Sequence, residues 1–102
     1  MSEVVELLAE LVRIPSINPS GAEPSDPEQG EQRIARFVLE YLAERGVACE
    51  LQQWRPGRPN VIARVAGTQP GPPLVMQTHM DTVAVDDMTI APFDPVTRAG
   101  RM

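Results

Sequence analysis

Eleven prolines divide this chain of 102 residues and limit where helices and strands can form. Proline lacks a backbone N–H and disfavours helical geometry at the residue before it, so regular elements are expected between the prolines. Residues 15–27 combine proline with Ser, Gly and Asn, which predicts a loop. Residues 67–73 predict a proline-rich turn, and Pro92 and Pro95 lie in an acidic, loop-like segment. The chain is therefore expected to consist of short elements.

The stretch before Pro15 has the pattern of an amphipathic helix. Ser2 is a suitable N-cap, and Pro15 is expected to end the helix by disfavouring helical geometry at Ile14. Apolar side chains recur on one face of this stretch, at Val4, Leu7, Leu8, Leu11 and Val12. A helix is therefore predicted between the cap at Ser2 and the stop at Pro15.

A second helix is predicted after the loop. Asp26, Pro27 and Gln29 have the order of an N-cap, a first helical residue and a capping-box partner. Gly46 is the expected C-terminal stop. One apolar face is formed by Ile34, Phe37, Val38, Tyr41 and Leu42.

After Gly46 the pattern becomes that of strands. Residues 47–54 and 60–65 predict two strands joined by a turn at Pro56 and Gly57. The segment 74–78 is mostly apolar, which is typical of a strand covered on both faces. Helices followed by strands predict an α/β fold, with two N-terminal helices packed on part of a mixed sheet.

Composition and charge exclude several classes of function. The net charge is −5, and the basic residues are all arginines scattered along the chain, which argues against nucleic acid as a partner. No apolar run reaches the length of about 18 residues that a membrane span needs. The N-terminus is acidic where a secretory signal is basic, so a cytoplasmic location is expected. Cys49 is the single cysteine, which excludes an intrachain disulfide and a cysteine-based zinc cluster.

The candidate site follows the apolar segment directly, at His79 and Asp81. In extended backbone, residues i and i+2 point to the same side, so the carboxylate can accept a hydrogen bond from one imidazole nitrogen. The other nitrogen is then free to bind a metal, as in carboxylate–histidine–zinc triads. The alternative is a hydrogen-bonded loop histidine beside an aspartate that caps a turn. The neighbouring Asp86, Asp87 and Asp94 are interpreted as a solvated acidic loop.

An ordered series of segments resembles one enzyme family. The run 79–83 is followed by 92–95 and 100–102, and it is preceded by the segment 14–19 and by Asn60 at the start of its strand. This series is similar to the co-catalytic zinc hydrolases, which include acetylornithine deacetylase, succinyl-diaminopimelate desuccinylase, aminoacylase and glutamate carboxypeptidase.

The resemblance implies a metal-dependent enzyme that hydrolyses an N-acyl-amino-acid or peptide bond. His79 would bind one of two zinc ions, with cobalt or manganese as alternatives, and Asp81 would be the catalytic aspartate that orients His79. Residues 1–102 would form the N-terminal portion of an incomplete zinc-exopeptidase-like catalytic domain. The remaining ligands, the general base and a lid or dimerisation domain would lie beyond Met102, so this fragment alone is expected to be inactive and the full-length protein to be a homodimer.

A rival interpretation comes from a different class of protein. In it the chain is a self-contained, non-catalytic α/β interaction module, and His79 and Asp81 only form a hydrogen bond. The two hypotheses differ in whether His79 binds a metal.

Overall fold

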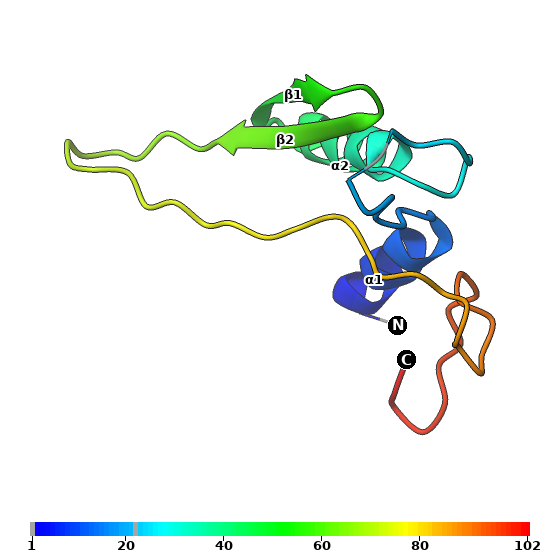
Figure 1. The fold of residues 1–102 in the computed structure, drawn as a ribbon. Coiled ribbons are helices and arrows are strands. Elements are labelled where there is room, and N and C mark those ends of the chain that lie inside the picture. Colours follow the sequence, from blue (N-terminus) through cyan, green and yellow to red (C-terminus); the bar gives the residue numbers. More distant parts are fainter. Residues whose placement is uncertain (1, 22) are drawn as a thin grey trace.

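The computed structural model describes residues 2–21 and 23–102, and its regular elements lie in the N-terminal two thirds of the chain (Figure 1). Their order is α1 (Glu3–Arg13), α2 (Gln32–Glu44), β1 (Ala48–Arg55) and β2 (Arg58–Arg64). The two strands pair antiparallel, and α2 packs against both of them. The expected α/β class is confirmed. Within the described residues the sheet has two antiparallel strands, so it is not the mixed sheet that the sequence suggested.

The first helix follows the prediction from local sequence. Ser2 caps it, and its hydroxyl oxygen accepts a hydrogen bond from the Val5 amide at 3.4 Å. The helix ends at Arg13 because Ile14, which precedes Pro15, is extended, with φ −97° and ψ 106°. α1 lies apart from the sheet (Figure 1) and contacts α2 at Glu3, which accepts a hydrogen bond from the Tyr41 hydroxyl at 3.2 Å.

The predicted start of the second helix is wrong. Asp26 caps a turn instead of the helix, since its side chain accepts from the Glu28 amide at 2.8 Å. The Gly30 amide then donates to the Ile17 carbonyl, in a short bridge between the loop and residues 28–30. Gly30 has φ +80°, which lies outside helical geometry. These contacts delay the helix to Gln32.

The end of α2 is as expected. Gly46 has φ +76°, its amide donates to the Ala43 carbonyl, and the Val47 amide donates to Leu42. These two bonds form a Schellman motif, in which a left-handed glycine satisfies the last helical carbonyls. The chain leaves the helix in the direction of β1.

The hairpin matches the sequence pattern within a few residues at each end. Pro56 and Gly57 form its turn, and Gly57 has φ +72°, the conformation that favours glycine at this position of a turn. The pairing register shifts between Gln53 and Arg55, where the ladder has a bulge. The two strands predicted here are confirmed.

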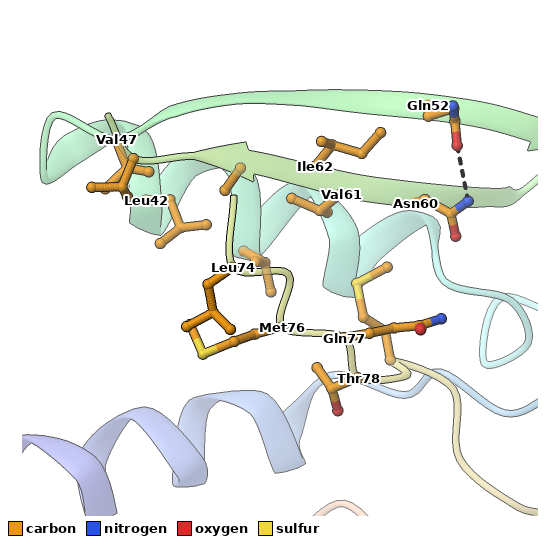
Figure 2. Close-up of a pocket in the computed structure, with 14 residues that line it drawn as sticks. Leu42, Val47, Gln52, Asn60, Val61, Ile62, Leu74, Met76, Gln77 and Thr78 are labelled. Atoms are coloured by element: carbon orange, nitrogen blue, oxygen red, sulfur yellow. Dashed lines mark hydrogen bonds between the residues drawn. The ribbon is translucent and has the colours of Figure 1, made fainter. Parts of the chain in front are cut away.

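The third predicted strand, residues 74–78, does not form. This segment is extended but has no ladder partner among the described residues, and Leu74 and Met76 are each 88% exposed. A groove of about 700 Å³ separates it from β2, and Figure 2 shows Leu74 and Met76 across this groove from Val61. The apolar sequence therefore signals a segment that needs covering, but the cover is not among these elements.

No helix in the part of the chain described here is long and apolar enough to cross a membrane.

Gly30 offers a test of how tightly the loop and the hairpin pack. A Cβ at Gly30 would lie 2.6 Å from the Gly57 carbonyl oxygen, whereas a Cβ at Gly46 would have nothing within 4 Å. Both residues have positive φ, where a Cβ costs about 1–2 kcal/mol, and overpacking adds about 1–3 kcal/mol at Gly30. Urea denaturation should show a larger loss for Gly30→Ala than for Gly46→Ala. Equal losses would contradict this packing.

The uncovered segment 74–78 predicts that this 102-residue chain self-associates. Exposed apolar residues next to an unpaired strand edge favour association, and a lysine there opposes it. Val75→Lys should shift the chain towards the monomer in sedimentation velocity across a concentration series. Gln69→Lys adds the same charge at an exposed polar position and serves as the control. A wild-type chain that stays monomeric and melts sharply and reversibly would contradict the prediction.

Candidate functional site

The backbone that carries the candidate site is anchored at residues 80–82. The Thr82 amide donates to the Ser16 carbonyl at 2.9 Å, and the Asn18 amide donates to the Thr82 carbonyl at 2.8 Å. The Ser16 hydroxyl donates to the Met80 carbonyl at 2.9 Å, and Ser16 is only 1% exposed. Buried hydrogen bonds of this kind hold the backbone firmly, because leaving either partner unpaired is costly. The chain is therefore fixed just after its uncovered apolar segment.

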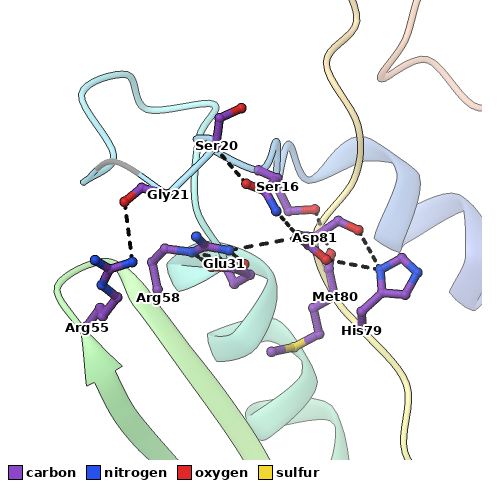
Figure 3. Close-up of polar contacts among 10 residues, drawn as sticks. Ser16, Ser20, Gly21, Glu31, Arg55, Arg58, His79, Met80 and Asp81 are labelled. Carbon is purple, nitrogen blue, oxygen red and sulfur yellow. Dashed lines mark hydrogen bonds and ion pairs between the residues drawn. The ribbon is translucent and has the colours of Figure 1, made fainter.

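His79 and Asp81 lie side by side, as their spacing predicted (Figure 3). The His79 Nδ1 lies 3.1 Å from Asp81 Oδ1 and 2.8 Å from the Asp81 carbonyl oxygen. Both partners are acceptors, so Nδ1 carries the hydrogen and the lone pair of the neutral ring is on Nε2. The His79 side chain is 83% exposed and the Asp81 side chain 23% exposed. The ring nitrogen that can bind a metal thus belongs to an accessible side chain.

The second carboxylate oxygen of Asp81, Oδ2, is contacted by Asn18 and Arg58. The Asn18 side-chain NH₂ donates to Asp81 Oδ2 at 2.6 Å, and the side-chain Oδ1 of Asn18 accepts from the Ser20 main-chain amide at 2.7 Å. Arg58 Nη2 lies 3.8 Å from the same Oδ2. Each oxygen of this carboxylate therefore has its own partners.

Arg58 is fixed in turn by Glu31. Arg58 Nε donates to Glu31 Oε2 at 2.9 Å and Nη2 donates to Oε1 at 2.7 Å, so the guanidinium and carboxylate meet in a two-point contact. Both residues are buried. The hydrogen bond to Glu31 raises the pKa of Arg58; burial opposes this, and the charges of Glu31 and Asp81 add to it. Arg58 is therefore a permanent positive charge beside Asp81.

The sequence named His79 and Asp81 as candidate site residues, but it did not indicate the three residues that the structure places behind them. Asn18 lies in the family-like segment 14–19, which was the one available signal for it. Glu31 and Arg58 are separated by 27 residues and belong to no local pattern. Their connection to the site is visible only in the folded chain.

The arrangement presents one side chain that could bind a metal, His79, rather than a complete metal site. No group of three or more His, Cys, Asp or Glu side chains that could hold a metal occurs in residues 2–21 and 23–102. Asp86, Asp87 and Asp94 are exposed and do not complete such a group. A zinc site needs three or four protein ligands, so His79 can provide one corner of it. The donor present, an accessible imidazole nitrogen on a ring whose other nitrogen contacts the Asp81 carboxylate, fits that use.

Two known proteins are similar in sequence to this chain. The chain is 26% identical over 103 residues to N-formyl-4-amino-5-aminomethyl-2-methylpyrimidine deformylase of Bacillus subtilis, covering 96% of this chain and 24% of that protein. It is 25% identical over 111 residues to an uncharacterized metallohydrolase of Methanocaldococcus jannaschii, covering all of this chain and 27% of that protein. The chain thus spans about a quarter of the length of these relatives.

Other comparisons add no further assignment. No protein-family model matches the chain, and no solved structure matches it. The two relatives are both named as hydrolases, one of them as a metallohydrolase, so the similarity points to a metallohydrolase-like family in general.

The tautomer of His79 is a direct test of the site geometry. As the single histidine, it can be followed without ambiguity by ¹⁵N NMR of its ring nitrogens, at about pH 9, where an ordinary imidazole is neutral. We expect the Nδ1–H tautomer in the wild-type chain and a shift towards Nε2–H in Asp81→Ala, because the carboxylate acceptor is removed. The main-chain carbonyl of residue 81 remains as an acceptor in this variant, so identical tautomer populations in the two proteins would show that the Asp81 carboxylate does not set the tautomer.

Proposed function

We propose that this chain is part of the catalytic domain of a metal-dependent amidohydrolase in which His79 binds a metal through Nε2. The observation that carries the proposal is the contact of His79 Nδ1 with Asp81, which leaves Nε2 free on an accessible ring. The similarity to proteins named as hydrolases supports the same class. Asp81 acts through His79 by fixing its tautomer and orientation.

Zinc is the metal proposed for this site. Imidazole nitrogen is a common zinc ligand, and cobalt and manganese remain alternatives. When bound, such a metal supplies Lewis-acid activation of water and of a carbonyl group. His79 is one ligand, and the further ligands of a complete site are additional to it. The resemblance to the co-catalytic zinc hydrolases implies two metal ions in such a site.

The substrate proposed is an amide, either an N-acyl amino acid as in acetylornithine deacetylase or a short peptide. The Bacillus subtilis relative is named as a deformylase of an N-formyl compound, and removal of an N-acyl group is the reaction proposed for this chain. N-formyl, N-acetyl and N-succinyl compounds are therefore the first substrates to compare.

The role of His79 is tested in the intact protein that carries this chain. His79→Ala should lower bound metal, measured by elemental analysis, and should lower amide hydrolysis more than about 100-fold, since loss of a ligand exceeds loss of a ligand's hydrogen-bond partner. Chelation of the wild type should abolish activity, and added zinc, cobalt or manganese should restore it.

Gln77→Ala, at an exposed position two residues before His79, is the control and should leave both measurements unchanged. Full metal content and full activity in His79→Ala would overturn the proposal. A wild-type protein that neither binds metal nor hydrolyses these amides would favour the non-catalytic interaction module instead.

A further inference from the structure

Behind His79 a row of side chains leads inward to the start of α2 (Figure 3). His79 contacts Asp81, Asp81 lies beside Arg58, and Arg58 is joined to Glu31 by hydrogen bonds from Nε and Nη2. Exposure falls along this row, from 83% for the His79 side chain to 23% for Asp81 and 9% for Arg58. The outermost member is thus accessible, and the innermost pair is buried.

We propose that Asn18 and Arg58 are positioning residues for the metal ligand His79. They hold Oδ2 of Asp81, and this keeps Oδ1 directed at the imidazole Nδ1. The inference rests on the proposed function and extends it to two residues for which no role is otherwise assigned.

The exposure of His79 makes its orientation dependent on Asp81. A ring that is 83% exposed has little packing to select one rotamer, so its two contacts with Asp81 supply most of the restraint. The terminal torsion of an aspartate is itself broad and roughly two-fold, so an unrestrained carboxylate would exchange its two oxygens. Restraint of His79 therefore requires restraint of Asp81.

Asn18 and Arg58 are suited to this restraint because each is fixed by other contacts. The Ser20 main-chain amide donates to the side-chain Oδ1 of Asn18, so the NH₂ group of Asn18 faces Asp81. The Glu31 carboxylate accepts hydrogen bonds from Nε and Nη2 of Arg58, and this two-point contact fixes the plane of the guanidinium. One residue supplies a short hydrogen bond and the other a fixed positive charge.

Arg64 provides the matched comparison on the same strand. It pairs with Glu50 at 3.1 Å, but its side chain is 69% exposed and this pair has no place in the row behind His79. A general effect of losing an arginine–glutamate pair from β2 would therefore appear in Arg64→Met as well. An effect on the site should appear only with Arg58.

The test uses the intact protein and two kinds of variant. Asn18→Ala removes the amide donor at an exposed position, and the double variant Glu31→Met, Arg58→Met replaces the buried pair by apolar side chains of similar length, which leaves no unpaired buried charge. Arg64→Met is the control, and His79→Ala tests the metal site itself. Affinity for Zn²⁺ is measured by competition with a chromophoric chelator, and the His79 tautomer by ¹⁵N NMR of the metal-free protein.

We expect Asn18→Ala and the double variant each to weaken zinc binding about 10–100-fold, the effect of removing a partner of a metal ligand. Both should also lower the population of the Nδ1–H tautomer, a signature that a loss of stability alone would not produce. Arg64→Met should change neither measurement. If circular dichroism shows that the double variant does not fold, Asn18→Ala decides the test.

The outcomes separate this inference from the proposed function. Wild-type zinc affinity and tautomer in Asn18→Ala and in the folded double variant would overturn the inference, provided that His79→Ala loses zinc. Unchanged zinc affinity in His79→Ala would overturn the proposed function, and the inference with it.

Discussion

The ion pair between Arg58 and Glu31 is the interaction on which the arrangement of this chain depends. It joins the hairpin to the residue that precedes α2, and Arg58 also lies beside Asp81 in the segment that follows. Exposed pairs such as Arg13–Glu10 contribute little, because water screens them and the side chains lose freedom. A buried pair is different: its desolvation is tolerated only with good geometry and further hydrogen bonds. That requirement fixes how three distant parts of the chain meet.

The elements that the sequence could predict are those whose causes are local. Ser2 and Pro15 set the ends of α1, and Gly46 ends α2 through contacts within a few residues. Two further features also depend on neighbours in sequence: the turn at Pro56 and Gly57, and the contact of His79 with Asp81. Local backbone rules are sufficient in all these cases.

Long-range contacts explain what the sequence could not predict. The capping-box pattern at Asp26 does not start the helix, because residues 28–30 form a bridge with Ile17 instead. Asn18, which donates to Asp81, is 63 residues away from it in sequence. The apolar pattern of residues 74–78 predicted a strand covered on both faces, but the segment is extended, unpaired and exposed among the described residues. It could not indicate the partner, and β2 lies across a groove from it. Sequence periodicity reports what a segment requires but not which segment supplies it.

The site is therefore anchored by polar contacts rather than by a sheet. A side chain at the end of a strand is ordinarily held in place by backbone hydrogen bonds to the neighbouring strands. Residues 74–78 make no such ladder among the elements described. The hydrogen bonds from Ser16 and Asn18 hold residues 80–82 instead, and Ser16 is almost fully buried, where hydrogen bonds are strongest. Because these contacts do not involve the apolar segment, the direction of the His79 ring and the covering of that segment are separate problems. The first is solved within this chain by Asp81 and its partners, whereas the apolar residues of the second stay exposed among the described residues.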